Sequence, residues 1–322
     1  MLFFEDLVDD WSYRAVPFRI TSGHTAWYQA FSGDQFRWCR DLAFARSVGQ
    51  QDCPVNSALV ASIVIGQSTA ATRAVVANLY YESVVFHRPI REGESITTTV
   101  RVLGGQEATP RPDRAPRGKV LLGIEAVDST GGPLVTMHRC ALVRKANSHP
   151  TSRRSMPDVP AVSGWAGIAA DRRFGATCET RPPIIVGDTA VDDLADPVTD
   201  ALGFVRLTGN EARAHRDAAQ GQDGRRLVYG GHTLALAQAA LSRMLPGLLD
   251  VLGWHRLEHP RPVFEEGLLR TSLLVRDVQP VTGGWLAVLD VRTIRVEART
   301  SAEDDVVQRW VPVVVVADPG TA

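Results

Sequence analysis

Two segments of this chain repeat one unusual pattern. Residues 32–41 read SGDQFRWCRD and residues 208–217 read TGNEARAHRD, and the glycine, both arginines and the final aspartate are identical between them. Each copy is followed at nearly the same spacing by a second related motif, HRPIREG at 87–93 and HPRPVFEEG at 259–267. Two ordered motifs that recur together indicate a duplicated domain. The copies differ at one position of chemical importance, where Cys39 stands in the first and His215 in the second.

The chain length agrees with this duplication. A chain of 322 residues has room for about two domains, each able to bury its own core. We therefore expect an N-terminal repeat over 1–146, with a degenerate motif, and a C-terminal repeat over 166–322 that carries the catalytic motif. Prolines and serines between them predict a linker over 147–165.

Composition and charge argue against several classes of protein. The 35 basic and 36 acidic residues nearly cancel, so no overall charge favours nucleic acid or an anionic membrane as a partner. The N-terminus MLFFEDLVDDW lacks the pattern of a secretion signal, and no apolar run reaches the roughly 20 residues that span a bilayer. The four cysteines show no CxxC spacing. We expect a cytoplasmic protein with reduced thiols that binds a small molecule, and a homo-oligomer stays open.

Hydrophobic patterning predicts the same elements in both halves. The apolar runs 54–66 and 230–241 are too long for strands and predict buried central helices. Strand-like runs follow each helix, at 77–86, 95–103, 119–128 and 133–144, and again at 251–258, 268–279, 285–296 and 306–316. The fold class predicted is α+β, with a sheet wrapped around one helix in each repeat.

Several shorter predictions concern the first half and the middle of the chain. A strand is expected over 11–20, a short helix over 22–31 and a mobile hairpin tip over 105–118. The stretch 166–187 has no clear pattern and receives no assignment.

The repeated loop resembles that of the MaoC-like (R)-specific enoyl-CoA hydratases, a family with the double hotdog fold. In that family the loop before the central helix reads D-x-N-P-x-H, and its aspartate and histidine together activate a water. Here Asn210 stands in the place of the aspartate and His215 keeps the histidine, whereas the first repeat has Asp34 and Cys39. Neither repeat has the complete pair.

Other motifs are similar to one branch of that family, the mesaconyl-CoA hydratase (β-methylmalyl-CoA dehydratase) group. They are NEARAH at 210–215, GRRLVYGGH at 224–232, FED at 4–6, VANL at 76–79 and HPRP at 259–262. The resemblance therefore spans most of the chain. It implies a hydratase or dehydratase that acts on the α,β double bond of an acyl-CoA, with no cofactor besides the coenzyme A of the substrate. A branched or dicarboxylic ester such as mesaconyl-CoA is one candidate substrate.

The resemblance and the residue types together give candidate site residues. His215 is the candidate acid or base, since the pKa of histidine lies near neutrality. Asn210 is expected to hold a water or the thioester carbonyl through its amide. Backbone N–H groups at the start of a helix suit a developing enolate oxygen, and Gly231 is the preferred donor. The residues expected to bind substrate are Gly230, Arg225, Arg226, His232 and Tyr229. No metal site is expected, because the histidines are scattered.

Plainer interpretations stay open for the same residues. The glycine pair can serve only as a turn into the helix, and the arginine pair as a solvated loop, although a guanidinium also suits a phosphate of coenzyme A or a carboxylate. Asp34 is expected to be structural, because its loop belongs to the other repeat. The arginines and the aspartate that both copies share are also attributed to the fold. His259 has a counterpart in His87, which suggests a role in the sheet, and it is kept, like His232, only as a candidate to support the site.

Two other functions remain alternatives to the hydratase. A thioesterase would also act on acyl-CoA, but such hotdog sites usually need a carboxylate base near the helix, and the motifs here supply none. The third possibility is a non-catalytic acyl-CoA-binding subunit whose incomplete Asp/His pairs reflect lost catalysis.

Overall fold

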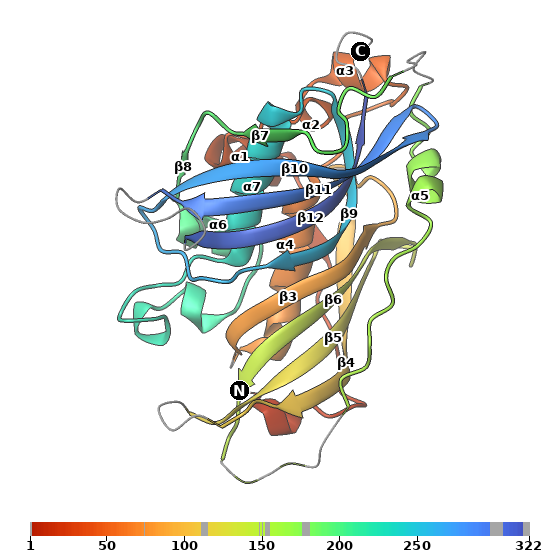
Figure 1. Cartoon of the computed structure of the whole chain (residues 1–322). Coiled ribbons are helices and arrows are strands. Elements are labelled where there is room, and N and C mark those ends of the chain that lie inside the picture. Colours follow the sequence, from red (N-terminus) through yellow and green to blue (C-terminus); the bar gives the residue numbers. More distant parts are fainter. Residues whose placement is uncertain are drawn as a thin grey trace.

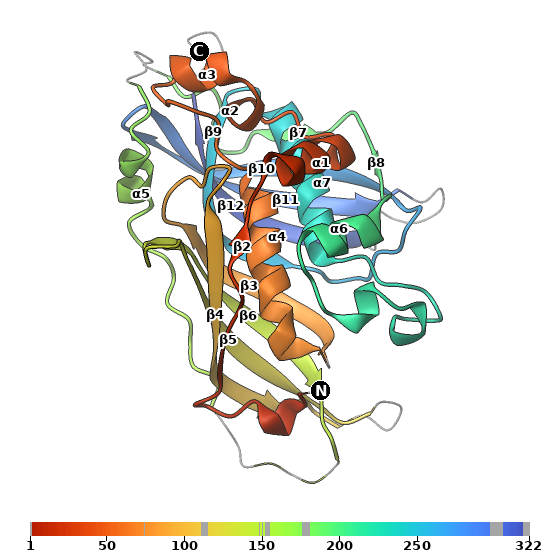
Figure 2. The ribbon, with the colours of Figure 1, turned by 180° about the vertical axis from the view of Figure 1, so that it is seen from behind.

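A single curved antiparallel sheet wraps around two central helices in the computed structural model (Figure 1). The structure describes residues 2–73, 75–110, 115–147, 149, 151, 155–175, 181–296 and 305–317. Seen from behind, α4 (Ser57–Ser68) and α7 (Gly230–Met244) lie side by side on one face of the sheet (Figure 2). The predicted α+β class and both predicted central helices are confirmed.

Each repeat contributes four long strands to the sheet. The first repeat has β3 (Val75–Phe86), β4 (Ser95–Glu107), β5 (Arg117–Val127) and β6 (Pro133–Arg144). The second has β9 (Leu248–Glu258), β10 (Leu268–Val281), β11 (Gly284–Arg295) and β12 (Val306–Val316). All eight predicted strands are therefore present, with ends shifted by a few residues. In the described part of the chain the order is β4-β5-β6-β3-β9-β12-β11-β10, so the two halves are related by a pseudo-twofold.

The halves join where β3 pairs with β9, with Tyr81 opposite Leu257. Short strands extend both outer edges of the sheet. In the first repeat β1 (Ser12–Arg14) and β2 (Phe18–Arg19) pair with β4, and in the second β7 (Thr189–Val191) and β8 (Asp196–Pro197) pair with β10. The single strand predicted over 11–20 is thus wrong. Pro17 lies between β1 and β2, where it has no backbone N–H to give to a ladder.

The remaining helices are short. They are η1 (Phe4–Asp6), α1 (Ser22–Ser32), α2 (Arg37–Arg40), α3 (Leu42–Ser47), η2 (Thr69–Thr72), α5 (Trp165–Asp171), α6 (Ala201–Leu207), η3 (Arg213–His215) and η4 (Ala218–Gln220). The helix predicted over 22–31 is α1, and α5 occupies the start of the stretch left unassigned. The hairpin tip predicted over 105–118 is shorter, because β4 and β5 run into it, and 111–114 lie outside the described residues. The domain boundaries stay predictions.

The two central helices are held together by buried polar contacts as well as by apolar packing. Gln238 of α7 donates to Asn56 Oδ1 at 3.0 Å and to Ser57 Oγ at 2.9 Å at the start of α4. Asn56 Oδ1 also caps that helix by accepting from the N–H of Ala58 at 2.8 Å. At the other end of α4, a Cβ on Gly66 would lie 2.0 Å from the carbonyl oxygen of Thr208, so only glycine allows this approach. The loop of the second repeat therefore rests on the helix of the first.

A buried ion pair fixes the segment between the repeats to the sheet. The guanidinium of Arg172, just after α5, donates through Nε to Asp250 Oδ2 at 2.6 Å, and the side chains are 1% and 8% exposed. Its other nitrogens donate to the carbonyls of Phe86 at 2.6 Å and His87 at 2.9 Å. Burial raises the pKa of Asp250, although Arg172 acts in the opposite direction. One arginine thus joins α5, β9 and the end of β3.

We predict that Arg172→Met lowers the free energy of unfolding by about 3 to 5 kcal/mol, because it leaves a buried carboxyl and two carbonyls without their donor. Denaturant unfolding measures this loss. The double variant Arg172→Met/Asp250→Leu should lose less than Arg172→Met alone. As a control, Arg276→Met removes a pair with Asp290 in which the arginine side chain is 51% exposed, and should cost at most about 1 kcal/mol. Equal losses in the two arginine variants would contradict this role for Arg172.

His232 lies in the core between the repeats. Its ring is 0% exposed and packs edge-on against Phe31 and Phe204, with ring centroids 4.8 and 5.8 Å away. Neither ring nitrogen has a hydrogen-bond partner among the described residues. Burial lowers the pKa of His232 to about 4, so the ring is neutral in the folded protein at neutral pH.

This lowered pKa predicts a specific loss of stability in acid. Between pH 6.5 and 4 the unfolded chain binds a proton at His232 that the folded chain does not, so stability falls as the pH falls, by up to about 1.4 kcal/mol per pH unit. His232→Leu should make the fall between pH 7.5 and 5 less steep in denaturant unfolding. His149→Gln, at an exposed position, serves as the control and should leave the slope unchanged. Identical slopes for His232→Leu and the parent protein would refute the prediction.

Candidate active site

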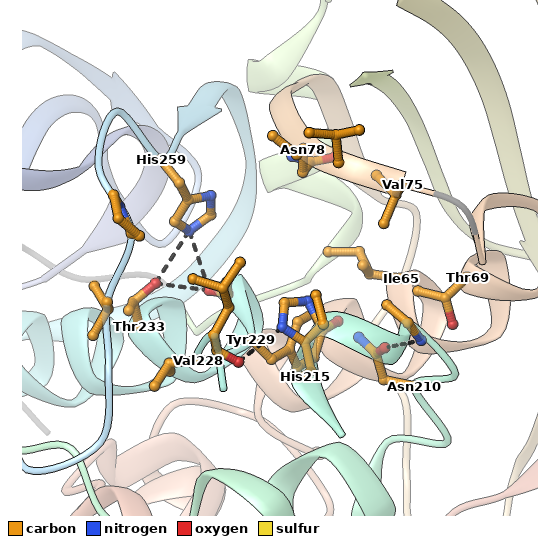
Figure 3. A pocket seen from close by; sticks show the side chains of 18 of the residues that line it. Ile65, Thr69, Val75, Asn78, Asn210, His215, Val228, Tyr229, Thr233 and His259 are labelled. Carbon is orange, nitrogen blue, oxygen red and sulfur yellow. Dashed lines mark hydrogen bonds between the residues drawn. The ribbon is translucent and has the colours of Figure 1, made fainter. Parts of the chain in front are cut away.

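A cavity of about 230 Å³ lies between the two repeats, beside the start of α7 (Figure 3). The second repeat lines it with the loop before α7 and the chain after β9. The first repeat lines it with the end of α4, the start of β3 and one residue of β6. Its polar lining residues are Thr69, Asn78, Tyr81, Arg139, Asn210, His215, Gln222, Tyr229, Thr233, His259 and Arg261. The site therefore needs both copies of the duplicated domain.

His215 is half-buried at the end of η3 and faces this cavity. Its Nδ1 lies 3.0 Å from the carbonyl oxygen of Leu227. Because a carbonyl can only accept, Nδ1 carries the proton and Nε2 keeps its lone pair. Desolvation lowers the pKa of His215 to about 4, with smaller effects in the same direction from Arg139 and His259. The ring is thus a neutral proton acceptor at physiological pH.

Asn210 also lines the cavity, but part of its amide is used by the loop itself. Its Oδ1 accepts from the N–H of Ala212 at 2.9 Å, which orients Nδ2 as a donor without a hydrogen bond to any described residue. The neighbouring Glu211 N–H donates to Thr69 Oγ1 of the first repeat at 2.8 Å. Asn210 is therefore held in place and retains a free N–H donor.

The glycines at the start of α7 are placed differently from one another. Gly230 lines the cavity, whereas Gly231 is buried behind it and does not. A Cβ on Gly231 would lie 2.6 Å from Ser62 Oγ and 2.7 Å from the Tyr229 ring. Tyr229 lines the cavity and donates from its hydroxyl to the carbonyl of Ser62 at 2.9 Å. The structure thus brings Gly230 to the cavity in preference to Gly231, the donor favoured from the sequence.

Three other predicted substrate-binding residues lie away from the cavity lining. His232 points into the core, as described above. Arg226 pairs with Glu265 Oε2 at 2.6 Å, and the guanidinium of the exposed Arg225 stacks 4.0 Å from the centroid of the Phe264 ring. These placements give both arginines structural partners on the chain after β9.

His259 and Arg139 are among the lining residues that the sequence interpretation undervalued or missed. His259 was expected only to support the site, yet it lines the cavity, with Nε2 within 3.2 Å of the Gly230 carbonyl and 3.1 Å of Thr233 Oγ1. Arg139 was not predicted at all. It is 3% exposed and occupies an inward position of β6, between the buried Met137 and Ala141. A charged residue on the apolar face of an alternating strand was the signal that could have found it.

In the first repeat, the position equivalent to this cavity is nearly filled by side chains. A cavity of about 20 Å³ remains there, lined by Cys39 and Trp38 and by the Arg172–Asp250 pair. Burial raises the pKa of the Cys39 thiol well above its usual range. Asp34 is fully buried and accepts from the Phe36 N–H at 3.1 Å and from Asn56 Nδ2 at 2.7 Å, which is consistent with the structural role expected for it.

The residues shared by both loops have matching contacts. Arg40 donates to the carbonyl of Asp34 at 2.5 Å, and Arg216 to the carbonyl of Asn210 at 2.7 Å. Asp41 caps α3 by accepting from the N–H of Phe44 at 3.0 Å, and Asp217 accepts from the N–H of Ala219 at 2.9 Å. These contacts support the attribution of the shared residues to the fold.

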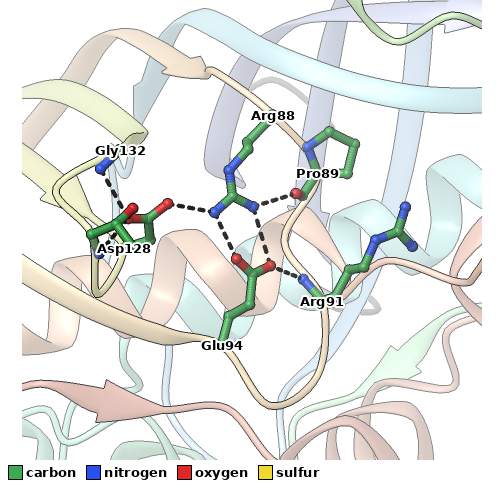
Figure 4. A network of polar contacts seen from close by, with 7 residues as sticks. Arg88, Pro89, Arg91, Glu94, Asp128 and Gly132 are labelled. Atoms are coloured by element: carbon green, nitrogen blue, oxygen red, sulfur yellow. Dashed lines mark hydrogen bonds and ion pairs between the residues drawn. The ribbon is translucent and has the colours of Figure 1, made fainter.

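The second repeated motif has diverged between the halves. In the first repeat Arg88 donates to Glu94 at 2.6 Å and to Asp128 at 2.8 Å, which ties the loop after β3 to the turn between β5 and β6 (Figure 4). In the second repeat His259 and the four residues after it line the cavity. The first copy is therefore structural, and the second forms part of the site.

The described residues contain neither a metal-ligand cluster nor a membrane-spanning helix. No group of three or more His, Cys, Asp or Glu side chains in that part of the chain is arranged to hold a metal ion. Likewise, none of the helices there combines the length and apolar character needed to cross a membrane.

Comparison with known proteins was made at the level of sequence and of structure. No family model matches the chain. The chain is 26% identical over 279 residues to the β-methylmalyl-CoA dehydratase of Chloroflexus aurantiacus, covering 81% of this chain and 78% of that protein. It is 25% identical over 317 residues to the mesaconyl-CoA hydratase of Cereibacter sphaeroides, covering 92% and 90%.

Solved structures share the fold over nearly the whole chain. Rv0216 of Mycobacterium tuberculosis, described as a double hotdog protein, has a TM-score of 0.82 and 29% identity, covering 98% of both chains. A MaoC domain protein from Chloroflexus aurantiacus has a TM-score of 0.83 and 23% identity, covering 98% of this chain and 97% of that one. The chain therefore has the double hotdog fold and is distantly homologous to mesaconyl-CoA hydratase and β-methylmalyl-CoA dehydratase.

Proposed function

We propose that this protein is a hydratase or dehydratase that adds or removes water across the α,β double bond of an acyl-CoA, with its catalytic site in the second repeat. The observation that carries the proposal is the neutral His215, whose Nδ1 is committed to the Leu227 carbonyl. A general base needs an available lone pair near the reacting water, and Nε2 supplies one. The names of the two distant relatives describe the same chemistry on branched dicarboxylic acyl-CoA esters.

In the hydration direction His215 Nε2 takes a proton from water while the oxygen bonds to the β-carbon. The electron pair of the double bond moves toward the thioester, whose carbonyl oxygen becomes enolate-like. The imidazolium then returns a proton to the α-carbon, so His215 ends the cycle neutral. One residue carries both transfers here, because Asn210 occupies the position of the family's aspartate and cannot exchange protons.

Donors for the developing oxyanion are available at the start of α7. This helix has 15 residues, and its N-terminal N–H groups and dipole favour negative charge. We assign this role to the Gly230–Gly231 turn, and assign to Asn210 Nδ2 a hydrogen bond to the reacting water or the thioester carbonyl. Arg225 and Arg226 stay the proposed contacts for a coenzyme A phosphate, since both are at or near the surface.

Neither alternative function is favoured by a specific contact. The lining residues of the cavity in the described structure include no aspartate or glutamate that would act as the base of a thioesterase. A non-catalytic subunit would not need a histidine held in the base form. Turnover by variants decides between these possibilities.

We predict that His215→Ala lowers kcat/KM for hydration of crotonyl-CoA by about 10² to 10⁴-fold, the usual contribution of a general acid–base. The matched control is Cys39→Ala, at the equivalent position of the first repeat, which should change kcat/KM by at most about threefold. Separation of the products measures turnover and distinguishes hydration from hydrolysis of the thioester. Equal turnover by the parent protein and His215→Ala would remove His215 from the mechanism.

The lowered pKa of His215 also predicts the pH dependence of the reaction. The base form is lost only as the pH falls through about 4, so kcat/KM should be level from pH 7 down to about 5 and have its acid limb near 4. Fluorescence recorded at each pH separates this limb from unfolding. An acid limb near 6.5 in the folded protein would mean that the base is not a desolvated His215.

A further inference from the structure

Two arginines line the cavity, the exposed Arg261 and the buried Arg139, and the proposed chemistry uses neither. Arg139 projects from β6 of the first repeat, and its side chain lines the cavity with only 3% of the residue exposed. Its Nε donates to Asn78 Oδ1 at 2.8 Å and its Nη1 to Ser68 Oγ at 3.0 Å. Both partners are neutral. Nη2 makes no hydrogen bond with any residue that the structure describes.

No carboxylate in the described part of the chain forms an ion pair with Arg139. Its cross-strand neighbour on β3 is Tyr81, whose ring centroid lies 5.9 Å from the guanidinium carbon. The nearby Glu82 pairs instead with Arg256 of β9 at 2.7 Å. A buried guanidinium without a counter-ion is costly, so it is retained where a ligand supplies the negative charge.

The other donors near Arg139 also suit an anion. Asn78 Oδ1 accepts from the guanidinium, which fixes the amide so that Nδ2 is a donor, and Nδ2 has no partner among the described residues. The two histidines of the cavity are neutral, because desolvation lowers the pKa of His215 and of His259 to about 4. The lining residues of the cavity that the structure describes include no aspartate or glutamate, and the neutral histidines add no positive charge, so an anionic group of a ligand would be the counter-ion of Arg139.

We propose that Arg139, oriented by Asn78 and Ser68, binds a carboxylate on the acyl chain of the substrate and is the residue that selects dicarboxylic acyl-CoA esters. The inference rests on the proposed function. A phosphate of coenzyme A is a poorer occupant, since Arg139 is buried whereas the candidate phosphate-binding arginines are near the surface. Arg139 and His215 line the same cavity, so a carboxylate bound to Arg139 would belong to the same acyl chain that reacts beside His215.

The first test is turnover of two substrates that differ only in this group. Fumaryl-CoA carries a carboxylate on the β-carbon, and crotonyl-CoA carries a methyl in its place. The parent protein should prefer fumaryl-CoA, and Arg139→Gln should lower kcat/KM for fumaryl-CoA on the order of 100-fold while crotonyl-CoA changes by at most about threefold. Equal losses on both substrates would assign Arg139 to the thioester or to the fold, and would overturn the proposal.

Matched variants separate charge from structure. Arg139→Lys keeps the charge but not the planar fork, and should retain part of the preference for fumaryl-CoA. Arg256→Gln removes a guanidinium from the neighbouring strand, where it pairs with Glu82 and Glu258, and should leave the preference unchanged. A preference lost equally in Arg256→Gln and Arg139→Lys would contradict a specific site at Arg139. If Arg139→Gln does not fold, the comparison of these two variants still decides the question.

A binding measurement distinguishes failure of this inference from failure of the proposed function. Succinyl-CoA and butyryl-CoA differ by the same exchange of carboxylate for methyl and have no double bond to react. Calorimetry should show tighter binding of succinyl-CoA, and Arg139→Gln should remove the difference. Equal affinities in the parent protein would overturn the carboxylate site alone, whereas no binding of either ester would overturn the proposed function as well.

Discussion

The contact between the two central helices is the constraint on which the rest of this molecule depends. Gln238 bonds to the start of α4, the Tyr229 hydroxyl donates to the Ser62 carbonyl within it, and Gly66 admits the Thr208 carbonyl at its far end. The loop of the second repeat that carries His215 is therefore built on the helix of the first. Because the cavity is lined from both sides of this contact, neither repeat forms the site alone.

Duplication followed by divergence explains why two equivalent positions differ, the open cavity beside His215 and the nearly filled one beside Cys39. The loops keep the same turn and the same arginine-to-carbonyl bond, so the backbone is preserved where the chemistry is not. In the first repeat a buried thiol replaces the histidine, and the Arg172–Asp250 pair occupies the space. That pair also anchors the segment between the repeats. The place in the first repeat has thus become a structural joint, whereas the cavity of about 230 Å³ lies beside the loop of the second repeat and is lined by both repeats.

Much of the fold was predictable because it depends on local pattern. Alternating and β-branched runs identified the eight long strands, and the repeated motif identified the loop that carries His215. The sequence could not show which way a side chain points once its element packs. His232 follows Gly231 directly, yet it faces Phe31 and Phe204 in the core. Arg139 lies 76 residues before His215 in the other repeat, and only the tertiary fold brings both to one cavity.

Arg139 and His215 of the proposed site interact electrostatically through the low dielectric of the cavity. Arg139 contributes to the lowered pKa of His215, which keeps the imidazole in its base form but makes it a weak base. A carboxylate bound at Arg139 would offset that positive charge, and so raise the proton affinity of His215 while the substrate is in place. A neutral acyl chain would leave the imidazole as it is. Selection of a dicarboxylic substrate and activation of its catalytic base would then follow from one ion pair, formed across the boundary between the repeats.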